Sequence, residues 1–496
     1  MTETPQPANQ PINKWKTLDK DLGRISHLER ATQYAARPLI APGLALAFIV
    51  LVAVVAAVFS GGSPDRIVVI AAAAFGAYMA LNIGANDVAN NMGPAVGANA
   101  LTMGGALLIA AIFETAGALI AGGDVVNTIS GGIVSPDSLG TGSDFIWAMM
   151  AAMIAGALWI NLATWMGAPV STTHSVVGGV MGAGIAAAGL MAVNWPTMGR
   201  IAASWVISPV LGGVVAAAFL AIIKARIMYA EDKIAAARRW VPFLIALMAG
   251  AFATYLALKG LSKVVKVSMT MALLIGLGVG AVTWALSVPM VRRQSEGLEN
   301  RKKSLKKLFG VPLVVSAALL SFAHGANDVA NAVGPLAAIV DAVQDGGGSA
   351  KVSIPLWVMV VGAAGISFGL VLFGPKLINM VGSEITKLNP MRAYCVALSA
   401  AITVIIASGL GLPVSSTHIA VGGIFGVGFY REWHSERRAR QLGIVKGKPV
   451  APEERGRRKL VRRSHFLTII AAWVITVPAT ALLSAVVFVG LRALAG

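Results

Sequence analysis

The heptapeptide G-A-N-D-V-A-N occurs twice, at residues 84–90 and 325–331, and each copy places an aspartate inside a long apolar run. If such a run crosses a bilayer, a charge at its centre costs about 2.5–3.5 kcal/mol or more, so Asp87 and Asp328 each need a partner. No Lys or Arg in the neighbouring apolar runs is placed to pair with them. We therefore expect a bound cation as the counter-charge. The alternative is that both aspartates only hydrogen-bond the interior of a helical bundle.

Asparagines surround both aspartates and would add neutral oxygen ligands. Positions 87 and 90 share one face of a helix, as do positions 328 and 331. Carboxylate and amide oxygens are hard donors, which suit Na⁺. The predicted cation-binding residues are Asn86, Asp87, Asn90, Asn327, Asp328 and Asn331.

A second duplicated motif, P-V-S-[TS]-T-H, predicts an anion site. Proline interrupts a helix, and the Ser and Thr residues that follow it are favourable N-caps for the next helix. A helix that begins inside the membrane presents free N–H groups and hydroxyls, which attract anions. The donors would be Ser171, Thr172 and Thr173 in one copy and Ser415, Ser416 and Thr417 in the other. Ordinary helix capping is the alternative interpretation.

The two motifs constrain each other. An anion close to two carboxylates is repelled unless cations lie between them, so anion binding should require the cation. At 100 mV, each extra positive charge that moves inward gains about 2.3 kcal/mol, which would drive a coupled carrier.

Three further titratable residues, Glu114, His174 and His418, lie in apolar segments and are candidates for gating or for a proton path. The alternative for each histidine is a neutral ring that supports the interrupted helix. For Glu114 the alternatives are cation binding and structural pairing.

The chain around these motifs has the composition of a membrane protein. Of its 496 residues, 56% are hydrophobic and 12% are charged, whereas soluble proteins carry about 25% charged residues. Apolar windows recur along the chain and predict an all-α integral membrane protein with about 12–13 transmembrane helices. Spans with Gly, Asn, Asp or Pro clusters at mid-sequence are expected to be broken or re-entrant.

The remaining composition excludes other classes of protein. The net charge of +18 comes from basic loops between apolar runs, which indicates membrane orientation rather than nucleic-acid binding. Cys395 is the only cysteine, which excludes an intrachain disulfide and a cysteine metal cluster. We expect no cofactor beyond the transported cation.

Three motifs recur in the same order and predict two repeats. Residues 82–98 resemble 324–338, residues 168–184 resemble 412–428, and residues 204–210 resemble 472–478. The predicted organisation is a cytoplasmic tail (1–38), an extra transmembrane helix (39–65), repeat 1 (66–223), a linker with two transmembrane helices (224–310) and repeat 2 (311–496).

Charge predicts the orientation of the repeats. The loops 224–240, 291–308 and 431–465 are rich in Lys and Arg and should face the cytoplasm, whereas loop 122–143 has acids and should face outside. The repeats are then inverted, which favours alternating access around a site at the midplane. The N-terminus would then be cytoplasmic, and we expect a multi-pass protein of the plasma membrane, such as a bacterial inner membrane. Lys259, Lys263 and Lys266 fall on the outer side and depart from this pattern.

These motifs together resemble the PiT family of inorganic phosphate transporters, and the resemblance extends from about residue 66 to residue 496. It implies a homodimeric symporter of inorganic phosphate with Na⁺ or H⁺, and the first-half motifs favour Na⁺. It also implies that Asp87, Asn327, Asp328 and the two Ser/Thr clusters bind phosphate. Some relatives carry a Glu shortly before the second Ser/Thr motif, where this chain has Ala397.

Two rival functions follow from the same residues. Hydroxyl donors would also bind another tetrahedral oxyanion such as sulfate, although only a protonated phosphate can donate a hydrogen bond to Asp87 or Asp328. Ser171 and His174 suggest a membrane hydrolase, but two residues so close on one helix start do not make a catalytic triad.

Overall fold

The computed structural model describes residues 39–61, 65–139, 142–166, 170–345, 352–380, 388–441 and 463–495. The predicted tail (1–38) and most of the basic insertion at 431–465 lie outside these residues. Contacts divide the chain after Ala47. Residues 39–47 begin a helix that ends at Phe59, and all other described helices belong to the second unit, Phe48–Gly496.

Helices form nearly all of the described structure, together with a single isolated bridge between Val134 and Val193. The long helices are α2 (Arg66–Gly97), α3 (Met103–Ala121), α5 (Gly142–Met166), α6 (Thr172–Ala188), α7 (Trp195–Ile223), α8 (Lys233–Lys259), α9 (Met269–Ser295), α11 (Gly310–Asp345), α12 (Leu356–Met380), α13 (Pro390–Gly409), α14 (Ser416–Gln441) and α16 (Arg463–Ala495). The short elements are α4 (Gly123–Asn127), α10 (Lys302–Leu308) and the helical turns η1 (Thr128–Gly132), η2 (Pro136–Leu139), η3 (Leu190–Ala192), η4 (Lys224–Met228) and η5 (Leu261–Lys263).

Eleven helices of the described chain are long and apolar enough to cross a membrane, which confirms the predicted all-helical membrane fold. The sequence also predicted spans near 175–194 and 418–430, and these correspond to α6 and α14. The 17 residues of α6 extend over about 25 Å, less than the hydrocarbon core of about 30 Å. The second half of α14 carries charged residues such as Arg431 and Arg438. Both helices begin at a Ser/Thr motif, as expected of re-entrant segments.

The prediction that the G-A-N-D-V-A-N spans are broken is wrong. Helix α2 continues through Asp87 to Gly97, and α11 continues through Asp328 to Asp345. Their glycines serve close packing instead. A Cβ atom on Gly84 would collide with the carbonyl oxygen of Ile366, and one on Gly325 with that of Glu114. Glycine therefore lets a neighbouring backbone approach, as is common between membrane helices.

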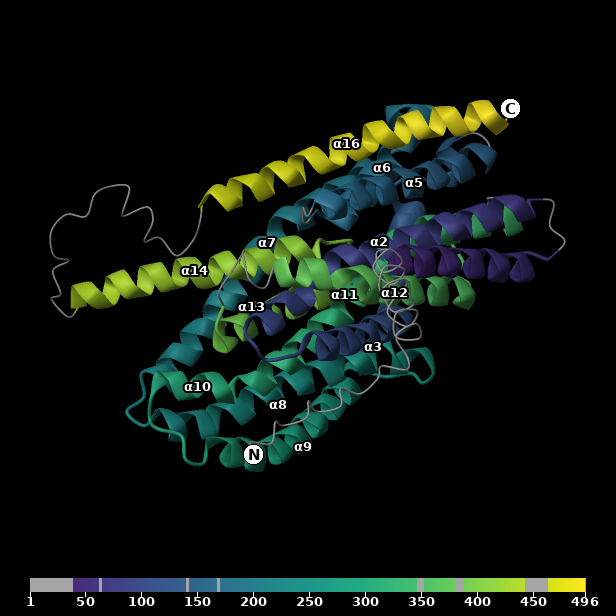
Figure 1. Ribbon diagram of the computed structural model, residues 1–496. Coiled ribbons are helices and arrows are strands. Elements are labelled where there is room, and N and C mark those ends of the chain that lie inside the picture. Colours follow the sequence, from purple (N-terminus) through teal and green to yellow (C-terminus); the bar gives the residue numbers. More distant parts are fainter. Residues whose placement is uncertain are drawn as a thin grey trace, which may run out of the picture. The chain divides into compact units, whose positions relative to one another are not determined.

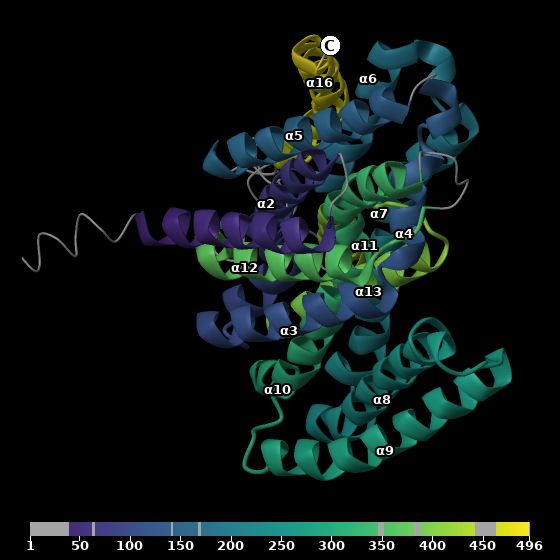
Figure 2. The ribbon, with the colours of Figure 1, turned by 90° about the vertical axis from the view of Figure 1, so that its right-hand side faces the viewer.

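Figures 1 and 2 show which helices lie side by side. Helix α2 packs along α12, and α11 packs along α3 and α13, so that α2 and α11 lie among the other helices. Helix α16 lies beside α6, whereas α14 lies beside α7. Helices α8 and α9 form a pair near one edge of these views.

Close backbone contacts occur in matched pairs. In each pair, a glycine of one repeat contacts a helix of the other repeat, and the equivalent glycine makes the equivalent contact in return. A Cβ atom on Gly117 would meet the carbonyl of Phe322, and one on Gly369 would meet that of Leu81. The third pair of motifs behaves in the same way, since Gly178 approaches Val477 whereas Gly422 approaches Pro209. Equivalent helices of the two motif sets therefore make equivalent contacts.

One substitution tests this packing. Gly325→Ala is expected to destabilise the fold by about 1–3 kcal/mol, because the added methyl group must displace the backbone at Glu114. Gly278→Ala in α9 is the matched control, because nothing lies within 4 Å of its Cβ position. Thermal unfolding of the purified protein in detergent measures both. Equal stability of Gly325→Ala and wild type would contradict the close contact.

Candidate functional site

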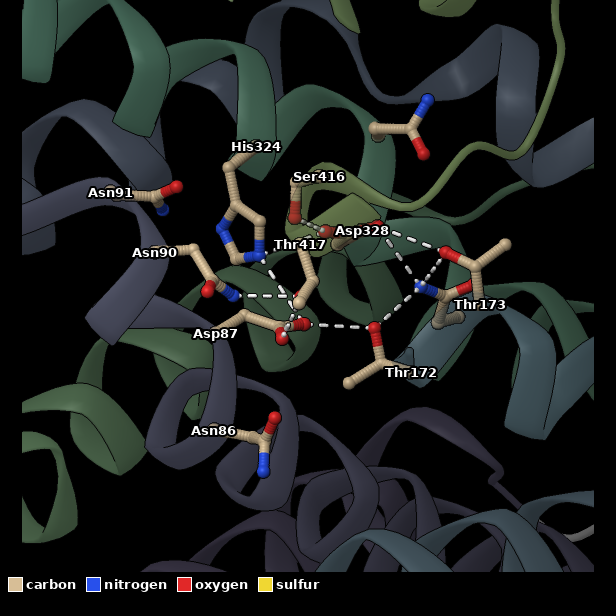
Figure 3. Close-up of polar contacts among 12 residues, drawn as sticks. Asn86, Asp87, Asn90, Asn91, Thr172, Thr173, His324, Asp328, Ser416 and Thr417 are labelled. Atoms are coloured by element: carbon tan, nitrogen blue, oxygen red, sulfur yellow. Dashed lines mark hydrogen bonds and ion pairs between the residues drawn. The ribbon is translucent and has the colours of Figure 1, made fainter. Parts of the chain in front are cut away.

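Asp87 of α2 and Asp328 of α11 lie in one buried polar cluster, and each is 1% exposed. Figure 3 shows both carboxylates facing the beginnings of α6 and α14. The two copies of each predicted motif thus meet at one place, although they are distant in sequence.

Hydroxyl groups donate to the two carboxylates in a reciprocal pattern. Asp87 accepts from Thr172 at 2.8 Å and from Thr417 at 3.3 Å. Asp328 accepts from Ser416 at 3.2 Å and from Thr173 at 3.3 Å. Each aspartate therefore accepts from the second hydroxyl residue of the Ser/Thr motif in its own half and from the third hydroxyl residue of the motif in the other half. This crossing joins the two halves at the site.

Asn90 and Asn331, each one turn after an aspartate, complete the cluster. Asn90 Nδ2 donates to Thr417 Oγ1 at 2.7 Å, and Asn331 Nδ2 donates to Thr173 Oγ1 at 3.2 Å and to Asp328 Oδ1 at 3.1 Å. These contacts fix the orientation of the threonine hydroxyls.

Asn86 and Asn327 donate to hydroxyl groups outside the carboxylate cluster rather than to the carboxylates. Asn86 Nδ2 donates to Thr164 at 2.9 Å, and Asn327 Nδ2 donates to Ser408 at 2.9 Å, again in equivalent positions. Asn327 also makes two hydrogen bonds to the backbone of the turn before α14. Its Nδ2 donates to Leu412 O, and its Oδ1 accepts from the N–H of Val414. In Figure 3 Asn86 lies apart from the network around Asp87.

Ser171 and Ser415 act as helix N-caps. The Oγ of Ser171 accepts from the backbone N–H of His174 at 3.1 Å, and the Oγ of Ser415 accepts from that of His418 at 3.3 Å. These caps set the first turns of α6 and α14, so that the next two hydroxyls of each motif face the carboxylates. In each motif, the first serine therefore caps the helix, and the two residues after it bind the carboxylates.

His324 is a member of the site that our sequence reasoning missed. Its Nε2 lies 2.8 Å from Asp328 Oδ2 and 3.6 Å from Asp87 Oδ2, and the ring is fully buried. The sequence-based expectation of a bound cation as counter-charge considered only Lys and Arg as protein partners and overlooked this histidine, which carries a positive charge when it is protonated. The available signal was the histidine directly before the second G-A-N-D-V-A-N, where the first copy has Ile83.

Glu114 of α3 approaches the other side of His324. Glu114 Oε2 lies 3.3 Å from His324 Nδ1, and Glu114 Oε1 accepts from Asn91 Nδ2 at 2.9 Å. The packing of the glycines makes Ile366 the positional equivalent of Glu114, so Ala397 of α13 is not its counterpart. Asn91, Glu114 and His324 form a polar triad that joins both halves, and none of the three has a polar counterpart, since the matching positions hold Ala332, Ile366 and Ile83.

His174 and His418 contact each other through their rings. Their ring centroids are 4.4 Å apart in an edge-on arrangement, and the ring of His174 also lies 3.8 Å from that of Trp205. The rings thus pack the starts of α6 and α14 against each other and against α7.

Two kinds of ligand match this chemistry. Ligand atoms of Asp87, His324 and Asp328 lie within 4.8 Å of one another, as a cation site requires. The amide oxygens of Asn86 and Asn331 have no hydrogen-bond partner among the described residues and can serve as further ligands. The N-termini of α6 and α14, with their hydroxyls, provide donors for an anion.

Comparison with known proteins agrees with this chemistry. A sequence profile of the phosphate transporter family matches residues 83–484. A provisionally named phosphate permease of Helicobacter pylori strain J99 is 46% identical, over 95% of this chain and 98% of its own length. Another from Pyrococcus abyssi is 36% identical, over 83% of this chain and 95% of its own length.

A solved structure shares the fold as well. It is described as the sodium-dependent phosphate transporter, is 35% identical and aligns with a TM-score of 0.77 over 86% of this chain and 99% of its own. Transport rather than catalysis is the activity of this group, which removes the hydrolase alternative. By sequence, by fold and by the motifs that form its buried site, this chain belongs to the phosphate transporter family.

Proposed function

We propose that this protein takes up inorganic phosphate by symport with a cation, Na⁺ rather than H⁺, through alternating access around the site of Asp87 and Asp328. The observation that carries the proposal is the crossed arrangement in which hydroxyls from both halves donate to both carboxylates. Such a site depends on both halves, so relative movement of the halves would open it toward one side or the other.

Phosphate would bind at the starts of α6 and α14. The hydroxyls of Thr172, Thr173, Ser416 and Thr417 and the first-turn N–H groups converge there, with Ser171 and Ser415 as caps and Asn327 beside the second turn. Two helix N-termini add favourable partial positive charge. Asp87 and Asp328 would accept hydrogen bonds from the hydroxyls of a protonated phosphate, which sulfate does not possess.

Cations would bind to Asp87 and Asp328 with the amide oxygens of Asn86, Asn90, Asn327 and Asn331. These carboxylates would repel phosphate unless positive charge lies beside them, so cation binding should precede or accompany phosphate binding. His324 supplies part of that charge when protonated, and a cation supplies the remainder. The sodium dependence named for the 35% identical structure supports Na⁺.

Uptake into proteoliposomes tests the proposal. Labelled phosphate should accumulate when an inward Na⁺ gradient is imposed, and a pH gradient without Na⁺ should give little accumulation. Unlabelled sulfate in excess should not compete. Accumulation driven by the pH gradient alone would overturn the assignment of Na⁺, and equal competition by sulfate would overturn the phosphate selectivity.

We further propose a homodimer in the plasma membrane, with repeat 1 at 66–223, repeat 2 at 311–496 and a cytoplasmic N-terminus. The family membership supports the dimer, and the basic loops support the orientation. Lys259, which departs from the charge pattern, pairs with Asp124 at 2.7 Å, so its charge on the outer side is balanced locally. Crosslinking in native membranes and labelling of the loops from each side test these assignments.

A further inference from the structure

A cavity of about 230 Å³ lies beside the turn that leads into α14. Its walls come from α4 and η1 on one side, from the first turns of α7 on another, and from residues 410–412. Its lining includes Asn127, Thr128, Thr197, Arg200, Gly411 and Leu412. The α4–η1 segment belongs to loop 122–143, which the charge distribution predicts to face outside.

Arg200 gives this cavity a positive charge. It is the only Lys or Arg between Arg66 and Lys224 in the sequence, and its side chain is exposed. Its Nη2 donates to Thr197 Oγ1 at 3.0 Å, and it forms no ion pair with any residue that the structure describes. The remaining donors of the guanidinium are therefore available to an oxyanion, which they bind in a planar fork.

Asn127 adds a different group to the same cavity. Its Oδ1 is buried and accepts no hydrogen bond from the described part of the chain. A buried acceptor without a donor is costly, so a ligand that donates to it is favoured. Protonated phosphate has oxygens for Arg200 and a hydroxyl for Asn127, whereas sulfate has only acceptors.

The turn at residues 410–412, which lines the cavity, is hydrogen-bonded to a residue of the buried site. Thr128 Oγ1 donates to Gly411 O at 2.6 Å, while Leu412 O on the same turn accepts from Asn327 at 3.1 Å. Two residues further along, Val414 O accepts from Thr173 at 3.0 Å. Gly411 has a φ of 68°, a conformation that favours glycine and allows this tight turn. The cavity and the buried site thus share one short segment.

We propose that this cavity is a first binding station for phosphate on the outer side, with Arg200 as the residue that captures the anion before it reaches Asp87 and Asp328. This inference rests on the proposed function. An exposed cation at the opening raises the local concentration of phosphate and accelerates its association, and salt screens the effect. The turn at 410–414 then separates the captured anion from the buried hydroxyls.

Neutralising Arg200 tests the capture step. In right-side-out vesicles with a Na⁺ gradient, Arg200→Gln should raise KM for phosphate about fivefold at low ionic strength with little change in kcat, because a single steering charge is lost. The difference from wild type should shrink as the salt concentration rises. Arg200→Lys should keep KM near the wild-type value.

A second experiment restores or reverses the charge at position 200 by chemical modification and measures the KM for phosphate again. The single native cysteine, Cys395, is buried, so Arg200→Cys introduces an accessible thiol. External treatment with a membrane-impermeant cationic methanethiosulfonate should lower the raised KM, and an anionic one should raise it further. Phosphate should slow both reactions. Met191→Cys is the matched control, because Met191 is 90% exposed, precedes α7 and does not line the cavity.

The outcomes separate this inference from the proposed function. No phosphate uptake by the wild type would overturn the proposed function itself. Normal wild-type uptake with an unchanged KM in Arg200→Gln would overturn only the capture station. Equal effects of the reagents on Arg200→Cys and Met191→Cys, or reaction only from the cytoplasmic side, would overturn it as well.

Discussion

Asparagine in place of Asp328 is expected to abolish cation-coupled phosphate uptake while the protein remains folded, and Asp87→Asn is expected to do the same. The side chain keeps its size, and the remaining Oδ1 still accepts a hydrogen bond from Thr173 or Ser416. What disappears is the negative charge that attracts the coupling cation.

The size of this effect follows from the burial of the site. At an effective dielectric constant of about 20, two unit charges about 4 Å apart attract by about 4 kcal/mol. Since about 1.4 kcal/mol corresponds to a factor of ten, the loss of one carboxylate should weaken cation binding by about a hundredfold to a thousandfold. Uptake at ordinary Na⁺ concentrations would then fall to background.

The measurement is Na⁺-driven uptake of labelled phosphate into proteoliposomes at equal protein density, with thermal unfolding as the test of folding. Asp137→Asn is the matched control, because Asp137 is exposed in η2 and should tolerate the same change. Wild-type uptake by well-folded Asp328→Asn or Asp87→Asn would show that the cation binds elsewhere.

Isoleucine in place of His324 is expected to destabilise the fold, and a second change, Glu114→Ile, is expected to restore part of the loss, because Asp328 and Asp87 still lack the histidine. When His324 is protonated it forms a buried ion pair with Glu114, and removing one partner of such a pair typically costs about 3–5 kcal/mol, because the other charge stays buried without compensation. Glu114 is 1% exposed and would retain only its bond from Asn91.

The chain itself indicates why the double variant should fold. The equivalent positions in the other half are Ile83, directly before Gly84, and Ile366, whose carbonyl meets Gly84 as that of Glu114 meets Gly325. Two isoleucines are therefore already accommodated in the same local geometry. Replacing a buried ion pair by apolar residues of similar volume is often neutral for stability.

Unfolding in mixed detergent micelles, with and without Na⁺, compares wild type, His324→Ile, Glu114→Ile and the double variant. We expect the double variant to be more stable than His324→Ile and closer to wild type. Additive destabilisation by the two changes would contradict the direct pairing of His324 with Glu114.

Much of this protein could be predicted from the sequence because its information is local or duplicated. Long apolar runs predict membrane helices, since a bilayer allows few other structures. Repeated motifs with Asp87 and Asp328, and with Ser171 and Ser415, marked the elements that meet in the polar cluster. The family resemblance rested on the same motifs, and the comparisons confirm it.

Other features depended on contacts between distant segments. Glycine and asparagine in the middle of α2 predicted a break, but the helix continues, and Gly84 instead allows the backbone of α12 to approach closely. His324 was overlooked because histidine is neutral or charged according to its surroundings, and those surroundings come from three separate helices. The crossed hydroxyl pattern also required the structure, since no spacing indicates that Thr173 faces Asp328 rather than Asp87.

The sequence by itself therefore determined the class of protein, the duplicated motifs and the kinds of ligand that carboxylates, amides and hydroxyls bind. Only the tertiary structure decided which groups share one buried volume, and hence that the two halves, alike in backbone packing, differ in the triad of Asn91, Glu114 and His324. The physical reason is that the charge and hydrogen bonding of a buried polar group depend on its neighbours in space, and in a membrane protein those neighbours are supplied by helix packing.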